Sequence, residues 1–234
     1  MSSYVAKGAI DAAILISARA EWLAALDFYN NPAVSETPFG ASFQINIAGK
    51  DVLFLQGGWG KVSAAASTQY CIDTWHPQVL INLGTCGGFA GRVKQGEILL
   101  VNETLIYDIV ERMGNPQEAL QHYSMHIDLS RLRPPYPQPV RVARLLSADR
   151  DIDPVEIPAL VTQYDAIAAD WESGAITWTA QRNNTRLLIL RGVSDLVSAA
   201  GGEIYNSPAF QQRANEIMTS LLQHLPGWIA CIGE

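Results

Sequence analysis

The sequence predicts a single α/β domain over residues 1–234, with a mixed, mainly parallel central sheet flanked by helices on both faces. Three observations lead to this fold class. Short aliphatic runs recur along the chain, segments with helical spacing separate them, and a length of 234 residues suits one large domain. Strands that alternate with helices of this length need crossover connections, which place the strands in parallel beneath two helical layers.

The predicted strands are apolar runs bounded by glycine or polar residues. Their content of leucine and β-branched residues is high, as expected of strands that are buried on both faces. They cover residues 12–17, 52–56, 79–84, 97–103 and 186–192. The run at 41–49 alternates apolar and polar residues, so we expect a half-exposed strand that leads into a turn at 49–51.

The segments between these strands carry apolar residues at helical spacing. The predicted helices cover residues 20–29, 61–75, 155–164, 172–183 and 207–224. Residues 112–139 interrupt the pattern, because they are rich in proline and polar groups and have weak periodicity. We therefore predict a long surface excursion or flap over this stretch.

Composition excludes several classes of partner. The net charge is −7 and 17% of the residues are charged, so the basic excess of a nucleic-acid-binding surface is missing. No apolar stretch reaches the roughly 18 residues that span a bilayer, and the first residues, "MSSYVAKGAID", lack a long apolar region. We therefore expect no nucleic acid and no membrane among the partners of this protein.

The cysteines and histidines show no ligand pattern. Three dispersed cysteines indicate a reducing compartment rather than a disulfide framework, so we expect a cytoplasmic protein. His122 and His126 lie four residues apart, a spacing that can put both on one helical face, but no third ligand accompanies them. We therefore expect no metal and no other cofactor.

Two glycine-rich segments each follow a predicted strand. They are "GGWGKVSAAAS" at 57–67 and "NLGTCGGFAG" at 82–91. Neither fits the dinucleotide fingerprint or the phosphate-binding P-loop. Their glycines would let the backbone approach a ligand or a neighbouring element closely, and a pair of tight turns explains them equally well.

Three carboxylates lie at the ends of apolar elements. Glu21 follows the run at 12–17, Glu172 precedes a predicted helix, and Asp195 follows the strand at 186–192. Each one alone is explained by the favourable interaction of an acid with a helix N-terminus. Ligands of parallel sheets bind beyond the carboxyl ends of the strands, so we expect the three acids to meet at one rim.

Several segments resemble the nucleoside phosphorylase and nucleosidase family. "INLGTCGGFAGRVKQGEILLVNE" is similar to its glycine loop and following strand, and "GGWGKVSAAAS" is similar to its Gly-x-Gly-Lys-Val segment. "AADWESGAI" and "RGVSDLV" resemble its Glu-Met-Glu and Arg-x-x-Ser-Asp segments, and "ISARAEWLAAL" resembles the loop with its catalytic glutamate. The matches keep the family's order from about residue 12 to about residue 200, which supports the predicted fold.

The resemblance implies attack on C1′ of a purine nucleoside by water or by phosphate. Hexameric phosphorylases carry a phosphate-binding arginine just before the glycine loop, where this chain has Asn82, as in the 5′-methylthioadenosine/S-adenosylhomocysteine nucleosidase branch. A carboxylate at Glu21 would repel phosphate and would deprotonate water, so we expect hydrolysis. Arg19 and Arg191 would supply positive charge, so phosphorolysis is the alternative. A nucleoside-binding protein without turnover is the third reading.

The resemblance also implies catalytic roles. Asp195 would protonate the purine at N7 as the general acid, and Ser194 would orient it. Glu21 would act as the base that activates water, and Thr85 and Arg191 would hold that water with it.

The resemblance also implies residues that bind the sugar and residues that bind the base. Glu172 would accept hydrogen bonds from the ribose hydroxyls, with Trp171 against the ribose. Backbone near Asp151 and Ile152 would read the purine edge, and Gly87 would contact the substrate. The family's Glu-Met-Glu appears here as Asp-Trp-Glu, so the 5′-substituent is left open.

Trp59 lies within a glycine loop, and we weigh it between core packing, a subunit contact and substrate stacking. The resemblance implies a homodimer or a higher homo-oligomer, because family members often complete the sugar pocket with a neighbouring subunit.

Overall fold

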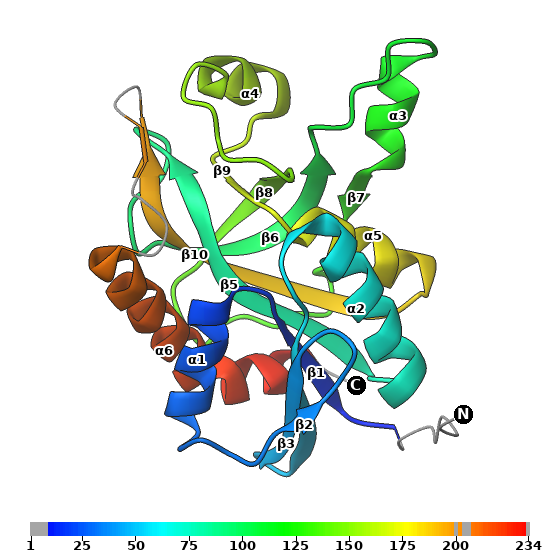
Figure 1. Cartoon of the computed structure of the whole chain (residues 1–234), viewed down its shortest axis with the longest axis vertical. Helices are drawn as coiled ribbons and strands as arrows, with labels where there is room; N and C mark the ends of the chain where they lie inside the picture. The colour runs from blue at the N-terminus through cyan, green and yellow to red at the C-terminus, as the bar shows by residue number, and fades with distance from the viewer. Residues whose placement is uncertain (1–8, 199–200, 203–206, 233–234) are drawn as a thin grey trace.

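A ten-stranded mixed sheet forms the centre of the chain (Figure 1). The computed structural model describes residues 9–198, 201–202 and 207–232, so most of the N-terminal stretch considered above lies outside the described residues. The strands are β1 (Ala12–Ile16), β2 (Ser35–Glu36), β3 (Ala41–Ile47), β4 (Lys50–Gln56), β5 (Val79–Phe89), β6 (Ile98–Ile106), β7 (Ser124–His126), β8 (Arg141–Ser147), β9 (Ala168–Asp170) and β10 (Arg186–Val197). The helices are α1 (Arg19–Phe28), α2 (Gly60–Trp75), α3 (Pro116–His122), α4 (Ile157–Tyr164), α5 (Ser173–Arg182) and α6 (Pro208–Cys231).

The sheet curls into a partly closed barrel. Its strand order is β10-β6-β8-β9-β5-β1-β4-β3-β2, and an additional pairing joins β10 to β5. This pairing closes a ring of β10, β6, β8, β9 and β5. Parallel ladders join β1 to β4 and β5, β5 to β10, and β8 to β6 and β9, while the other ladders are antiparallel. The prediction of a mixed α/β sheet is therefore confirmed.

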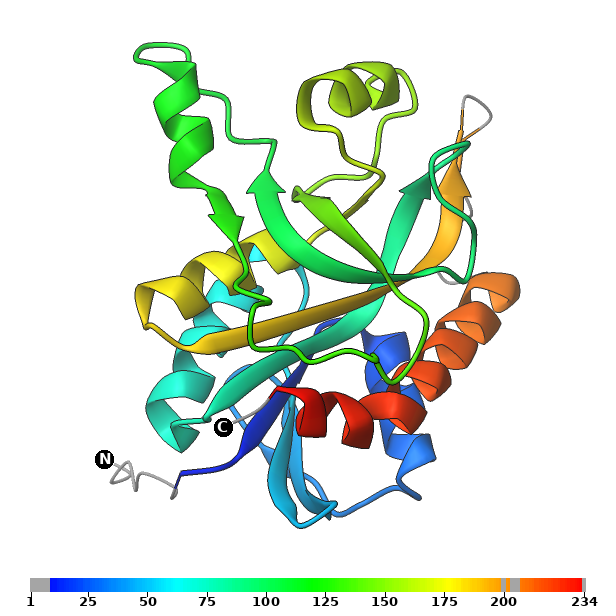
Figure 2. The same ribbon diagram turned by 180° about the vertical axis from the view of Figure 1, so that it is seen from behind.

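Helices cover both faces of the sheet, as predicted. Along β1, Ala12, Ile14 and Ile16 pack with residues of α1 and α6, whereas Ala13 and Leu15 pack with residues of α2 and α5. The alternation follows from the strand period of two. Figures 1 and 2 show the two helical layers on opposite sides of β1 and β5.

The turn between β3 and β4 lies earlier than the predicted 49–51. Ala48 and Gly49 have φ values of 51° and 83°, and Lys50 already belongs to β4. Two successive residues with positive φ form the tight hairpin connection that suits the twist of the flanking strands. Lys50 and Asp51 therefore pair with β3 instead of turning.

The segment 112–139 has two parts with different surroundings. Its first part contains α3, which projects from the sheet in Figure 1, and β7, which pairs with β6. Its second part runs back over the core, where Ile127 is buried and the ring of Tyr136 stacks on that of Trp228 at 5.5 Å. Within the described residues, no helix combines the length and the apolar character needed to cross a bilayer.

Candidate active site

A cavity of about 440 Å³ opens where strands β5, β9 and β10 and the loop after β1 meet. Nine of the ten residues predicted for the site line it: Glu21, Thr85, Gly87, Asp151, Ile152, Trp171, Glu172, Ser194 and Asp195. Arg191 does not line it. A larger cavity of about 560 Å³ lies near the first residues of β5 and β10 and contains none of the ten. The predicted site residues therefore converge on one place, at the carboxyl ends of the parallel strands.

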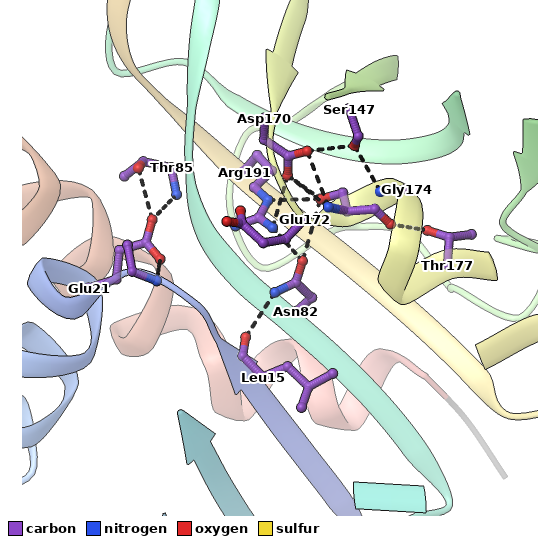
Figure 3. Close-up of polar contacts among 12 residues, drawn as sticks. Leu15, Glu21, Asn82, Thr85, Ser147, Asp170, Glu172, Gly174, Thr177 and Arg191 are labelled. Carbon is purple, nitrogen blue, oxygen red and sulfur yellow. Dashed lines mark hydrogen bonds and ion pairs between the residues drawn. The ribbon is translucent and has the colours of Figure 1, made fainter. Parts of the chain in front are cut away.

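Glu21 is buried at the start of α1, with only 3% of its surface exposed. One carboxylate oxygen accepts hydrogen bonds from the backbone N–H and the hydroxyl of Thr85 at 2.6 and 2.8 Å, and the other accepts from the N–H of Ala18 at 3.2 Å (Figure 3). Burial raises the pKa of Glu21, while Arg191 and the Thr85 donors oppose the rise. A carboxylate with a raised pKa is better matched to proton transfer near neutral pH.

Arg191 is fully buried beside the cavity and is held by three polar side chains (Figure 3). Its guanidinium lies 3.0 Å from a carboxylate oxygen of Asp170 and donates to the amide oxygen of Asn82 at 2.6 Å. Its Nε donates to the hydroxyl of Ser173 at 3.0 Å. The sequence did not single out Asp170 or Ser173, although Asp170 replaces the first glutamate of the family's Glu-Met-Glu segment.

Gly84 separates Arg191 from Glu21. A Cβ atom on Gly84 would lie 2.0 Å from Nη1 of Arg191 and 2.9 Å from Oε1 of Glu21. Arg191 pairs with Gly84 across the β5–β10 ladder, so its side chain crosses the glycine directly. Because Gly84 has no side chain, the Arg191 guanidinium and the Glu21 carboxylate can both approach its Cα atom.

Gly84→Ala is expected to lower the free energy of unfolding by about 1–3 kcal/mol and to reduce turnover, because the new methyl group displaces a buried guanidinium. Urea unfolding and steady-state kinetics measure the two effects. Gly114→Ala is the control, because a Cβ there meets only Glu111 at 3.6 Å. Equal stability and turnover in the Gly84 and Gly114 variants would show that the glycine is not needed for this approach.

Glu172 is the N-cap residue of α5 and is 7% exposed. Its Oε1 accepts a hydrogen bond at 3.0 Å from the N–H of Gly60, the first residue of α2. Burial and the nearby charge of Asp170 raise the pKa of Glu172 to about 8, against the opposing effects of Arg191 and the Gly60 N–H. A proton on Glu172 is therefore favoured at neutral pH.

The raised pKa predicts that stability falls as pH rises. Between pH 4.5 and 8 the folded chain holds a proton on Glu172 that the unfolded chain releases, so deprotonation disfavours the folded state. We expect wild type to lose stability relative to Glu172→Gln across this window, by an amount on the order of a few kcal/mol. Urea unfolding at pH 5, 6, 7 and 8 measures the difference, and parallel pH profiles for the two proteins would contradict it.

Asp195 and Ser194 lie at a register shift in the β5–β10 ladder. Such an irregularity re-aims side chains, and both residues line the cavity. The Ser194 hydroxyl lies 2.8 Å from Oδ1 of Asp195 and 3.2 Å from the carbonyl oxygen of Cys86, and it donates to one of them at a time.

Gly87 and Ile152 are in close contact on the same side of the cavity. A Cβ on Gly87 would lie 2.8 Å from Cδ1 of Ile152, so an alanine there would push the end of the Ile152 side chain aside. Asp195 pairs with Gly87 across the β5–β10 ladder. Gly87, Ile152 and Asp195 therefore line one part of the cavity together, and we call this part the slot.

Within the described residues, no group of three or more histidine, cysteine or acidic side chains is arranged to hold a metal ion. His122 ends α3 and His126 lies in β7, so the two do not share a helical face as their spacing allowed.

The match to the phosphorylase superfamily extends over residues 14–225, and the chain belongs to this family. The 5′-methylthioadenosine/S-adenosylhomocysteine nucleosidase of Anoxybacillus flavithermus is 27% identical over 188 residues, which cover 75% of this chain and 80% of the relative. The enzyme of the same name from Marinomonas sp. is 25% identical and covers 78% and 84% of the two chains.

Solved structures show the same fold. The corresponding nucleosidase of Campylobacter jejuni superposes with a TM-score of 0.75 at 16% identity, covering 94% of this chain and 98% of the other. A futalosine hydrolase mutant of Helicobacter pylori gives a TM-score of 0.73 at 15% identity, with 92% and 98% covered. At sequence identities this low, the structural similarity is evidence for the fold alone.

Proposed function

We propose that this chain hydrolyses the N-glycosidic bond of a purine nucleoside of the 5′-methylthioadenosine/S-adenosylhomocysteine kind and releases the base and the sugar. The observation that carries the proposal is the convergence of Glu21, Glu172 and Asp195, from three distant segments, on one cavity. Relatives named as nucleosidases of these compounds support the same reading.

The proposed mechanism divides the cavity between the two products. The base lies in the slot beside Gly87 and Ile152, where Asp195 donates a proton to purine N7 as the C1′–N9 bond breaks. Glu172 accepts hydrogen bonds from the ribose hydroxyls. Glu21 removes a proton from a water that attacks C1′ of the oxocarbenium-like sugar.

Arg191 serves this mechanism through its charge. It lies outside the cavity lining, but its positive charge opposes the effect of burial on the pKa values of both Glu21 and Glu172. We therefore propose Arg191 as a positioning residue that keeps Glu21 next to Thr85, and Thr85 as the group that fixes the carboxylate for the water.

Water is favoured over phosphate because the cations near the cavity are already paired. Arg191 is neutralised by Asp170 at 3.0 Å, and Arg150, which lines the cavity, forms two hydrogen bonds with Glu156 at 3.0 and 2.6 Å. Arg19 is exposed and does not line the cavity. A phosphate dianion would therefore meet Glu21 without a guanidinium to compensate its charge.

The test is a panel of purine nucleosides incubated with and without phosphate, with the products separated by chromatography. The proposal predicts free base and free sugar in equal amounts and no dependence on phosphate. Sugar 1-phosphate that forms only with phosphate would establish the phosphorylase alternative. Binding of nucleosides without release of base would establish a non-catalytic binding protein.

We further propose that the chain works as a homodimer or a higher homo-oligomer in the cytoplasm. Several large hydrophobic side chains outside the cavity lining are exposed, among them Val62, Val110, Met113 and Val155. A second copy of the chain would cover them. Sedimentation velocity at micromolar concentration checks this, and a monomer would contradict it. The three cysteines are unpaired, which supports a reducing compartment.

A further inference from the structure

Two tryptophans stack on one another at the edge of the cavity. The rings of Trp59 and Trp171 lie 4.9 Å apart, with an angle of 23° between their planes, and both residues line the cavity. Trp59 is nevertheless 62% exposed, so the contact with Trp171 covers only part of its ring. Such a large exposed aromatic surface at the mouth of a cavity is a typical ligand-binding feature.

The backbone ties this pair to Glu172. Trp59 is the N-cap residue of α2, and the next residue, Gly60, donates its N–H to Glu172 at 3.0 Å. Trp171 directly precedes Glu172. The pair therefore lies beside the group assigned to the ribose hydroxyls, whereas Ile152, Gly87 and Asp195 form the slot assigned to the base.

We propose that Trp59 makes this site selective for nucleosides whose 5′ carbon carries a planar aromatic group. The inference rests on the proposed function for the orientation of the nucleoside. With the ribose at Glu172, the 5′-substituent is the part that extends from the sugar toward the cavity mouth. A flat ring there extends the Trp171–Trp59 stack by offset stacking, which a puckered aliphatic ring of similar size cannot do.

A matched pair of substrates tests this selectivity. They are the 5′-phenylthio and 5′-cyclohexylthio derivatives of 5′-deoxyadenosine, with the inosine derivatives as a second pair. We expect wild type to favour the phenyl compound about threefold to tenfold in kcat/KM, the range that aromatic stacking supplies beyond buried area. Trp59→Leu keeps an apolar side chain without a flat face, and we expect it to remove the preference.

The ratio of the two rates is independent of how much of a preparation is folded or assembled, because both substrates are measured on the same sample. Trp178→Leu is the control. Trp178 lies on α5, contacts His122 of α3 and Arg182 of α5, and does not line the cavity. It is expected to keep the wild-type ratio. An unchanged ratio in Trp59→Leu, or no phenyl preference in wild type, would overturn the inference.

Calorimetric binding of the same compounds separates this inference from the proposed function. If base is never released, the proposed function fails, but the phenyl preference is still measurable as a ratio of dissociation constants in wild type and Trp59→Leu. If base is released without a phenyl preference, only the inference about Trp59 fails.

Discussion

Asp195→Asn is expected to lower kcat on a natural purine nucleoside by about 10²-fold or more, as is usual when a general acid is lost. Asparagine keeps the shape of the side chain and can still accept a hydrogen bond from Ser194, which lies 2.8 Å from Asp195 in the native chain. It has no acidic proton to give to the departing base. The rate of base release, followed by absorbance or chromatography, measures the loss.

An N7-methylated purine nucleoside sharpens this test. Its base leaves without protonation at N7, so the Asp195→Asn variant is expected to lose much less activity on this substrate than on the unmethylated one. Asp73→Asn is the matched control, because Asp73 is exposed on α2 and accepts a hydrogen bond from Gln69 one helical turn away. Equal losses on both substrates would point to a damaged site rather than to a missing proton donor.

The convergence of the acids was predictable because it depends on a property of parallel sheets. The predicted apolar runs at 12–17, 79–84 and 186–192 lie mainly in β1, β5 and β10, and the side chains that follow each run emerge at one edge of the sheet. Glu21 and Asp195 follow this rule, as does Thr85, whereas Glu172 follows the short strand β9, which the sequence did not predict. A motif of modest specificity at each strand end was therefore enough to place Glu21, Thr85 and Asp195 in one cavity.

The closure of the barrel was not predictable from local patterns. β8 begins with Arg141 and carries a second arginine, Arg144, so its sequence does not form an apolar run. β9 has only three residues, Ala168–Asp170, and its pairing with β5 and β8 depends on contacts distant in sequence. Both strands were missed, although they complete the ring that carries Asp170 into the site.

The buried charge network was missed for a related reason. Arg191 sits at the end of an apolar strand, which suggests a role in the cavity, but its partners Asp170 and Ser173 lie on β9 and α5. A fully buried guanidinium requires such partners, because an unpaired buried charge is strongly unfavourable. Only the folded chain shows that Arg191 faces these groups and that its guanidinium and the Glu21 carboxylate both approach Gly84.

Glu21→Gln is expected to lower the hydrolytic kcat by about 10²-fold to 10⁴-fold, because the proposed base can no longer accept a proton from water. The amide group also cannot satisfy all three donors that the carboxylate serves, namely two from Thr85 and one from Ala18. Stopped assays of sugar release measure the effect. Glu216→Gln on α6 is the control, because Glu216 is exposed and contacts Gln212 within the same helix.

The same variant distinguishes the two nucleophiles. If water is the nucleophile, the wild-type rate rises with pH as Glu21 loses its proton. Because burial raises the pKa of Glu21, this rise occurs at a pH above the ordinary range for glutamate. The Glu21→Gln variant is expected to lose this pH dependence. If phosphate is the nucleophile, removal of the negative charge beside Arg191 relieves repulsion, and phosphate-dependent turnover increases. We expect the first result, since Asp170 already neutralises Arg191 and leaves no cationic site for phosphate to gain.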